Sequence, residues 1–267
     1  DNPEYALPEG TLLVPNTLLA LQDLARAWRR ELGLPIIGIT GTNGKTTTKE
    51  LLATVLSTKY NLHYTQGNLN NQIGVPLTLL QITRAHEMAI VEMGASHPGD
   101  IKELVDIAEP NYGLITNVGR AHLEGFGSFE GVQRTKQELY DYLVAHNGII
   151  FRNADNPYLA EMENQAKQCY TTLHNTTQLY TTGSMPSGTH LVGEYNAENV
   201  SAAICVGKHF GISCEQALEA IRQYVPTNNR SQKMQTDNNQ LIVDAYNANP
   251  TSMQAAINAF KGDTYIL

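Results

Sequence analysis

The chain has 267 residues, 42% of them hydrophobic, and its 18 Lys and Arg residues against 26 Asp and Glu give a formal net charge of −8. The hydrophobic content excludes a wholly disordered chain, and the length predicts one large α/β domain with at most some appended pieces. The acidic balance argues against a partner that is nucleic acid or an anionic membrane, because both need a basic face. A monomer is the default expectation.

Cysteine usage and apolar run length indicate the compartment. The cysteines, Cys169, Cys205 and Cys214, are odd in number and lack C-x-x-C spacing, so the sequence predicts neither a disulfide framework nor a zinc site. No apolar run reaches the ~18 residues of a membrane-spanning helix, and the first residues lack a signal-peptide pattern. We therefore expect a soluble, cytoplasmic protein.

The chain begins with a segment that shows no periodicity and then enters a predicted helix. Residues 1–16 contain prolines and are expected to form a tail. The helix is expected to begin at Thr17, which can cap it, and apolar residues then recur at helical spacing. Gly33 and Pro35 are the signals that end it.

The remaining pattern alternates strands and helices. Short apolar runs typical of buried parallel strands occupy 35–40, 88–93, 113–117, 148–151, 241–245 and 264–267. Helical patterns occupy 46–57, 99–108, 129–145, 196–210, 214–224 and 251–260. This alternation predicts an α/β fold with a mostly parallel sheet flanked by helices. Residues 170–190, rich in Thr, Ser, Gly and Asn, are expected to form a small antiparallel subsheet or a loose loop.

A glycine-rich turn lies between the first predicted strand and the helix that follows. It reads Gly41, Thr42, Asn43, Gly44, Lys45, Thr46 and Thr47. Glycines let backbone amides face one point, and a helix N-terminus adds positive potential there. Lys45 can then reach phosphates and Thr46 can ligate Mg²⁺. The strict G-x-x-x-x-G-K-[ST] pattern is not met, because Ile39 occupies its first position, so a glycine turn opening an ordinary helix is the alternative.

Four further side chains are candidates by position. Glu92 and Asp244 each end a predicted strand, where ligands of open α/β sheets gather, although a neighbouring helix N-terminus could equally satisfy such an acid. His122 follows a strand in a loop, where most histidines are simply polar surface groups. Lys136 is predicted to lie on a solvated helix face.

Several segments together resemble the ATP-dependent Mur ligase family of peptidoglycan synthesis. In the family's order they read ITGTNGKTTTKELL (39–52), GNLNNQIGVPLTLL (67–80), VEMGASHPGDI (91–101), TNVGRAHLEGFGS (116–128), RTKQEL (134–139), GEYNAENVSAA (193–203) and DAYNANPTSM (244–253). Tyr195-Asn196 with Asn199, and the run 246–250, point to the MurF branch rather than to its siblings or to folylpolyglutamate synthases. The resemblance implies the P-loop NTPase-like central domain of such a ligase.

The resemblance assigns roles to the candidate residues. The run Gly41 to Thr47 would cradle the phosphates of ATP. Thr46 and Glu92 would hold one Mg²⁺ and His122 a second. Lys136 matches a family lysine that is carbamylated and then ligates metal as a carboxylate does, and only the resemblance supports this role over the solvated helix face. The remaining assignments are Asn196 and Asn199 near the adenine, Asp244 at the ribose, Arg230 near the γ-phosphate, and Asn70 and Asn71 on the muramyl-substrate side.

The implied reaction is amide ligation through an acyl phosphate. The terminal carboxylate of UDP-MurNAc-tripeptide attacks the γ-phosphorus of ATP, and the amine of D-Ala-D-Ala then displaces phosphate. No protein nucleophile is needed, so Lys45, Lys136, His122 and Arg230 would act through position and charge.

The resemblance also carries an expectation about domains. Residues 1–16 would be the remnant of an N-terminal UDP-binding domain, 17–267 the central ATP-binding domain, and the C-terminal domain of the family would be absent. The chain alone is therefore expected to bind ATP weakly and to ligate little.

Two other readings stay open. One is another Mur-type or folylpolyglutamate-type ligase that uses the same ATP site with a different acceptor. The other is a non-catalytic nucleotide-binding module, which would bind ATP without releasing ADP.

Overall fold

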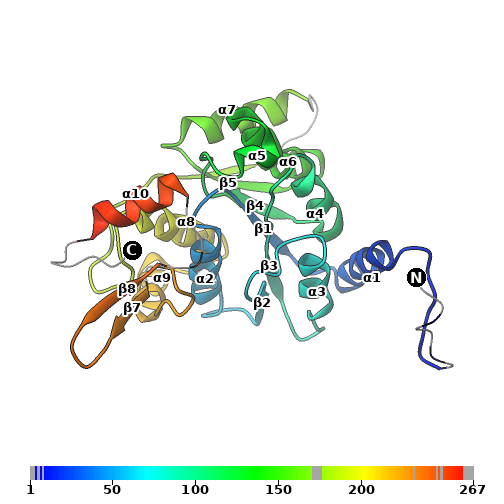
Figure 1. The fold of residues 1–267 in the computed structure, drawn as a ribbon, viewed down its shortest axis with the longest axis horizontal. Helices are drawn as coiled ribbons and strands as arrows, with labels where there is room; N and C mark the ends of the chain where they lie inside the picture. The colour runs from blue at the N-terminus through cyan, green and yellow to red at the C-terminus, as the bar shows by residue number, and fades with distance from the viewer. Residues whose placement is uncertain are drawn as a thin grey trace.

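A computed structural model describes residues 4, 7, 9–169, 176–230, 232–244, 246 and 249–260. Its main feature is a six-stranded sheet with helices on both faces, and a two-stranded sheet lies beside it (Figure 1). Within the described residues, no helix is long and apolar enough to cross a membrane.

The six strands are all parallel to their neighbours and run in the order β2-β3-β1-β4-β5-β6. Their bounds are β1 (Ile36–Thr40), β2 (Leu62–Tyr64), β3 (Met88–Glu92), β4 (Tyr112–Ile115), β5 (Ile149–Asn153) and β6 (Thr177–Tyr180). The register pairs Ile39 with Glu92 and Thr40 with Ile115. The carboxyl ends of β3 and β4 therefore flank the carboxyl end of β1.

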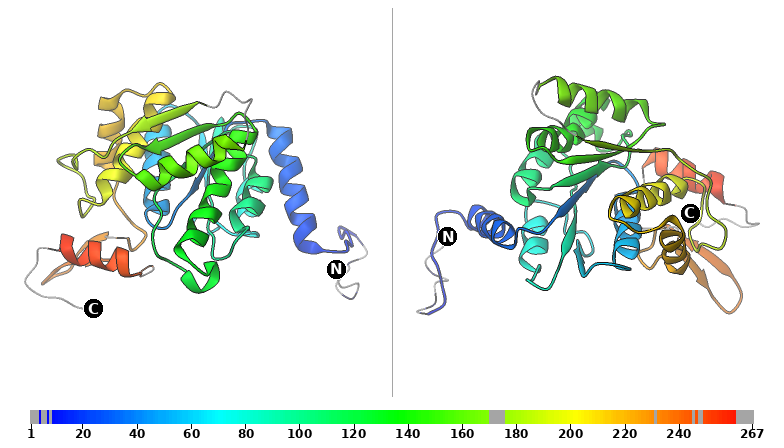
Figure 2. Two further views of the ribbon diagram at one scale, coloured as in Figure 1. Left: turned by 90° about the horizontal axis from the view of Figure 1, so that it is seen from above. Right: turned by 180° about the vertical axis from the view of Figure 1, so that it is seen from behind.

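Two layers of helices cover the sheet (Figures 1 and 2). One layer contains α1 (Thr17–Leu32), α3 (Gly74–Leu80), α4 (Asp100–Ala108), α6 (Phe129–Ala145) and α7 (Pro157–Gln168). The other contains α2 (Lys45–Leu56), α8 (Asn196–His209) and α9 (Cys214–Gln223). A short helix, α5 (Leu123–Phe126), precedes α6.

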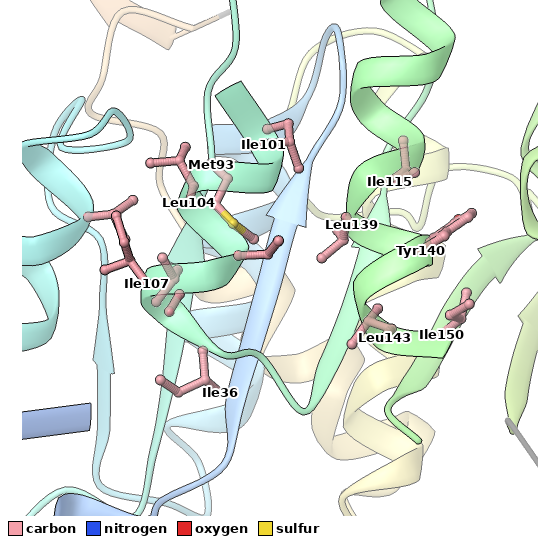
Figure 3. Close-up of a cluster of buried hydrophobic side chains, with 14 of the residues drawn as sticks. Ile36, Met93, Ile101, Leu104, Ile107, Ile115, Leu139, Tyr140, Leu143 and Ile150 are labelled. Atoms are coloured by element: carbon pink, nitrogen blue, oxygen red, sulfur yellow. The ribbon is translucent and has the colours of Figure 1, made fainter. Parts of the chain in front are cut away.

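The core lies on both faces because β1 and β3 are buried along their whole length. Alternate residues point to opposite faces. Ile36 belongs to the cluster beneath α4 and α6, drawn in Figure 3, whereas Ile37 and Ile39 belong to the cluster beneath α2. Continuous burial explains why these strands appear in the sequence as unbroken apolar runs.

The small antiparallel sheet lies where the sequence did not predict it. Strand 241–245 was expected in the main sheet, but β8 (Gln240–Val243) pairs antiparallel with β7 (Gln232–Gln235), mostly exposed to solvent. Segment 170–190 instead supplies β6, a parallel edge strand. A short apolar run fixes neither the partner nor the direction of a strand, so strand 241–245 was assigned to the wrong sheet. Segment 170–190 has a polar composition without periodicity, which likewise fixed no strand direction, and its expected antiparallel strands or loop were wrong. The pair and α10 (Pro250–Ala259) lie on the opposite side of the molecule from α1 (Figure 2).

Most helix bounds match the sequence to within one residue, and 129–145 matches fully. The predicted cap Thr17 is wrong, because Asn16 accepts the bond from the backbone N–H of Leu19 at 3.0 Å. Elements β2, α3, α5, α7 and β7 were not predicted. The expected strand 264–267 lies outside the described residues.

Candidate nucleotide site

A cleft of about 490 Å³ opens at the carboxyl ends of β1 and β3. It brings together segments from the turn after β1, the start of α8 and the region around β8 and α10. The predicted residues that line it are Thr42, Asn43, Gly44, Lys45, Thr46, Thr47, Asn70, Asn71, Glu92, His122, Asn196, Asn199, Arg230 and Asp244. Gly41 and Lys136, the other two predicted residues, are not in its lining.

Both glycines of the turn are required by geometry. Gly41 has φ +143°, and a Cβ there would lie 2.0 Å from Oγ1 of Thr116. Gly44 caps α2 with φ +78°, and a Cβ would lie 2.7 Å from Oδ1 of Asn199. A side chain at either position meets both strain and a clash. The turn is therefore built to bring bare backbone against its neighbours.

The segment after β4 braces the turn. The backbone N–H of Asn43 donates to Oδ1 of Asn117 at 3.0 Å, and Oγ1 of Thr116 donates to the carbonyl of Asn43 at 2.6 Å. The backbone N–H of Thr42 donates to the carbonyl of Asn117 at 3.0 Å. Sequence reasoning gave Thr116 and Asn117 no role, although both stand in the quoted segment 116–128.

Lys45 lies over the turn. Its ammonium donates to the carbonyls of Gly41 at 2.8 Å and Thr42 at 3.1 Å. Burial lowers the pKa of Lys45, Glu92 opposes this shift, and the charge of Arg230 adds to it. The cleft thus holds two cations close enough to repel, an arrangement suited to an anionic ligand.

Glu92 forms the polar base of the cleft and is 1% exposed. Its Oε1 accepts hydrogen bonds from Oγ1 of Thr46 at 3.2 Å and from Nδ2 of Asn70 at 2.9 Å. Its Oε2 is buried and has no hydrogen-bond partner in the described structure. A buried carboxylate oxygen that accepts no hydrogen bond, beside a threonine hydroxyl, is a donor set that suits Mg²⁺.

This donor set is small. Among the described residues, no three His, Cys, Asp or Glu side chains cluster as a complete metal site. Mg²⁺ characteristically takes one or two protein ligands and completes its shell with water and phosphate oxygens. The pair of Thr46 and Glu92 therefore fits a cation that is shared with a nucleotide.

Lys136 is buried, so its predicted place on a solvated helix face is wrong. It is 2% exposed, on the inner side of α6, and its Nζ lies 5.7 Å from the ring centroid of Phe126. The ring of His122 packs edge-on against the same phenyl ring, with centroids 6.5 Å apart. Burial first, and then the charge of Lys45, lowers the pKa of Lys136 to about 7. The structure thus brings Lys136 and His122 to one aromatic side chain.

The two asparagines of α8 connect that helix to α2. Oδ1 of Asn199 accepts from Oγ1 of Thr48 at 3.0 Å, and its Nδ2 donates to Oδ1 of Asn196 at 2.9 Å. Nδ2 of Asn196 donates in turn to the carbonyl of Val192 at 2.7 Å. This buried chain fixes α8 beside Gly44. Contact of either asparagine with adenine stays a prediction.

Asn70 and Asn71 have different surroundings. Asn70 contacts Glu92, as described above. Oδ1 of Asn71 accepts from the backbone N–H groups of Ile73 at 3.1 Å and Gly74 at 2.9 Å, where α3 begins. Both side chains line the cleft, and their role in substrate binding stays a prediction.

The region around β8 and α10 supplies the outer wall. The guanidinium of Arg230 lies 3.9 Å from the ring centroid of Tyr246. Nδ2 of Asn249, the cap of α10, donates to Oδ1 of Asn43 at 2.7 Å. Asp244 lines the same space. In the sequence reasoning Tyr246 and Asn249 were only markers of the family branch and had no part in the predicted site, although the motif 244–253 that contains them could have indicated one.

Comparison with known proteins decides the family. A family model described as the Mur ligase middle domain matches residues 39–207. The chain belongs to this Mur ligase family. It is 41% identical over 263 residues to the UDP-N-acetylmuramoyl-tripeptide–D-alanyl-D-alanine ligase of Bacillus subtilis, covering 93% of the chain and 57% of that relative. The predicted family is therefore confirmed.

Solved structures agree with the Mur ligase assignment. A MurF structure from Acinetobacter baumannii matches with a TM-score of 0.83 and 32% identity, over 93% of this chain and 59% of that one. MurF from Thermotoga maritima in complex with ADP matches with a TM-score of 0.80 and 27% identity, over 93% and 62%. The predicted fold class is confirmed. The chain spans less than two thirds of the length of these relatives.

Proposed function

We propose that this chain is the ATP-binding part of an ADP-forming ligase that joins D-Ala-D-Ala to UDP-MurNAc-tripeptide. The observation that carries the proposal is its 41% identity, across 93% of the chain, to the Bacillus subtilis relative of that name. The cleft adds independent support, because nearly all the residues predicted for ATP line one cavity. The ADP bound to the Thermotoga maritima structure supports ATP as the nucleotide.

The proposed reaction has two displacements. A carboxylate oxygen of the tripeptide attacks the γ-phosphorus, the bond to the bridging oxygen breaks, and ADP leaves. The amine nitrogen of D-Ala-D-Ala then attacks the acyl phosphate carbon, the C–N bond forms, and phosphate departs as the amine proton is released. The chain contributes position and positive charge, and none of its side chains acts as a nucleophile.

Each wall of the cleft has a part in this scheme. The backbone of residues 41–47 and the ammonium of Lys45 would bind the phosphates, and Arg230 would approach the γ-phosphate from the opposite wall. Asn196, Asn199 and Asp244 would bind the nucleoside. Asn70 and Asn71 would face the acceptor substrate.

The residues present fit a magnesium ion, because the buried Oε2 of Glu92 accepts no hydrogen bond. Thr46 and Glu92 would hold it, and it would neutralise charge on the phosphate oxygens. We propose that His122 and Lys136, the latter as a carbamate, would hold a second Mg²⁺ ion. Their common packing against Phe126 supports this pairing. We also propose a cytoplasmic, monomeric protein whose partners are small molecules.

The test has two stages. Calorimetric titration of the 267-residue chain with ATP and Mg²⁺ measures nucleotide binding. ADP release is then measured with a three-domain protein that contains this chain, given UDP-MurNAc-tripeptide with and without D-Ala-D-Ala. We expect ADP release that depends on both acceptors. Binding without ADP release would indicate a non-catalytic module, and turnover with a different acceptor would indicate another ligase of the family.

A further inference from the structure

Lys49 is a buried cation that the proposed function does not use. It lies on α2, one turn after Lys45, and its side chain is fully buried. Its Nζ donates to the carbonyl of Thr65 at 2.7 Å and lies 5.7 Å from the ring centroid of Tyr64. A buried lysine is costly unless a compensating charge lies near it, so its neighbours need explanation.

Two carboxylates lie within reach of Lys49. Its Nζ is 3.0 Å from Oε1 of Glu50 and 4.0 Å from Oε2 of Glu92. The Glu50 side chain is 24% exposed, whereas the Glu92 side chain is 2% exposed. Attraction between charges is stronger where water is excluded. We therefore expect the stability of the fold to depend more on the Lys49–Glu92 pair than on the shorter Lys49–Glu50 pair.

The 4.0 Å separation has a chemical consequence. It is too long for a hydrogen bond, so Lys49 offsets the charge of Glu92 without occupying Oε2. The other oxygen, Oε1, is held by Thr46 and Asn70. Thr65 links the two charged residues, because its carbonyl accepts from Lys49 and its Oγ1 accepts from the backbone N–H of Glu92 at 3.0 Å.

We propose that Lys49 is a positioning residue for the candidate metal site, acting as the internal counter-charge of Glu92. This inference rests on the proposed function and deepens it. With Lys49 in place, Glu92 is already balanced, and a divalent cation gains little by binding to the protein alone. The cation therefore binds together with the nucleotide, whose phosphates supply the missing negative charge.

The first test measures binding of Mn²⁺ alone by electron paramagnetic resonance, without nucleotide or acceptor. Lys49→Gln keeps an N–H donor for Thr65 but removes the charge. We expect it to bind Mn²⁺ about tenfold or more tightly than the unaltered chain, because a repelling cation has gone. Lys49→Arg should restore the original affinity. Unchanged or weaker Mn²⁺ binding by Lys49→Gln would overturn the proposal.

The second test is a pair of double-mutant cycles in urea, again without ligands. We expect Lys49→Gln to lower the folding equilibrium constant by about tenfold or more, and Glu92→Gln to remove most of that loss. The matched control Glu50→Gln should leave the loss intact. If Lys49→Gln does not fold, rescue by Glu92→Gln supports the proposal, whereas rescue by Glu50→Gln alone, or by neither, contradicts it.

Both tests are separate from the proposed function. A chain that fails to bind ATP, or whose longer form releases no ADP, refutes the ligase and leaves the Mn²⁺ and urea results standing. Loss of the Mn²⁺ effect with intact ATP binding refutes only the role of Lys49.

Discussion

The two walls of the cleft are built in opposite ways. On the sheet side, β1 and β3 are buried along their length, and Thr46, Glu92 and Asn199 are buried beside them. On the other side, β7 and β8 are mostly exposed, and Tyr246 is 49% exposed. The sheet side is held by many mutual hydrogen bonds, and a hydrogen bond from Asn249 to Asn43 joins the outer wall to it. We infer that the phosphate end is preorganised and that the outer wall adjusts to the ligand.

The largest expected effect tests the preorganised wall at Lys45. Lys45→Ala should reduce ligation by roughly a thousandfold or more, because the charge that we propose to act on the transferred phosphoryl group is lost. Initial rates of ADP release by the three-domain protein measure this. Lys102→Ala, which removes an exposed ammonium paired with Asp106, is the control and should leave the rate unchanged. Near-normal ligation by Lys45→Ala would refute the assigned role.

The second prediction concerns backbone shape on the same wall. Gly41→Ala should lower the free energy of unfolding by roughly 3 kcal/mol, since the new methyl group meets Thr116 and the φ of +143° is strained for alanine. Gly127 has φ +75°, but a Cβ added there meets open space. Gly127→Ala should therefore lower the free energy of unfolding only by the backbone strain. Urea unfolding compares the two, and equal losses would show that the close approach does not matter.

A third, smaller effect concerns the buried Lys136. Its pKa of about 7 in the folded chain lies below the ordinary 10.5, so between these values the unfolded chain binds more protons and stability rises with pH. Lys136→Met should therefore be more stable than the unaltered chain by about 2 kcal/mol at pH 6. The gain should shrink as the pH rises toward 10. Urea unfolding at several pH values measures it, and a gain independent of pH would contradict the shifted pKa.

The smallest effect tests the outer wall at Tyr246. Tyr246→Leu removes the ring that faces Arg230 and should weaken ATP binding by roughly threefold to fivefold, the size of an exposed cation–π contact. Tyr246→Phe keeps the ring and should bind as the unaltered chain does. Calorimetric titration separates them. If Tyr246→Leu weakened ATP binding as much as Lys45→Ala does in the same titration, the outer wall would be as rigid as the sheet wall.

The same contrast explains what could be predicted from the sequence. The turn at 41–47 was predictable because backbone conformation and charge there are set by local residue types. Strand 88–93 was predictable because burial on both faces leaves an unbroken apolar run. The partner of strand 241–245 was not, because its pairing depends on the preceding strand, Gln232–Gln235, and not on its own composition.

Side-chain partners and roles were harder to predict than burial. Lys136 stands four residues after Val132 and three before Leu139, so the periodicity of α6 places it on the buried face. It was nevertheless predicted to be solvated because of its charge, and only the family resemblance gave it a role. Lys49 was missed because the role we propose for it depends on its distances to Glu92 and Thr65. Such relations arise from tertiary contacts, which one sequence does not display.

The hydrogen bond between Asn43 and Asn249 joins residues 206 positions apart. During synthesis, the turn and its supporting strands can assemble long before residue 249 has been made, but the outer wall cannot meet them until then. Bringing together residues so far apart in sequence also carries a large loop-closure entropy. The complete cleft therefore exists only once residue 249 has been made, and a nucleotide that contacts both walls can stabilise it only from then on.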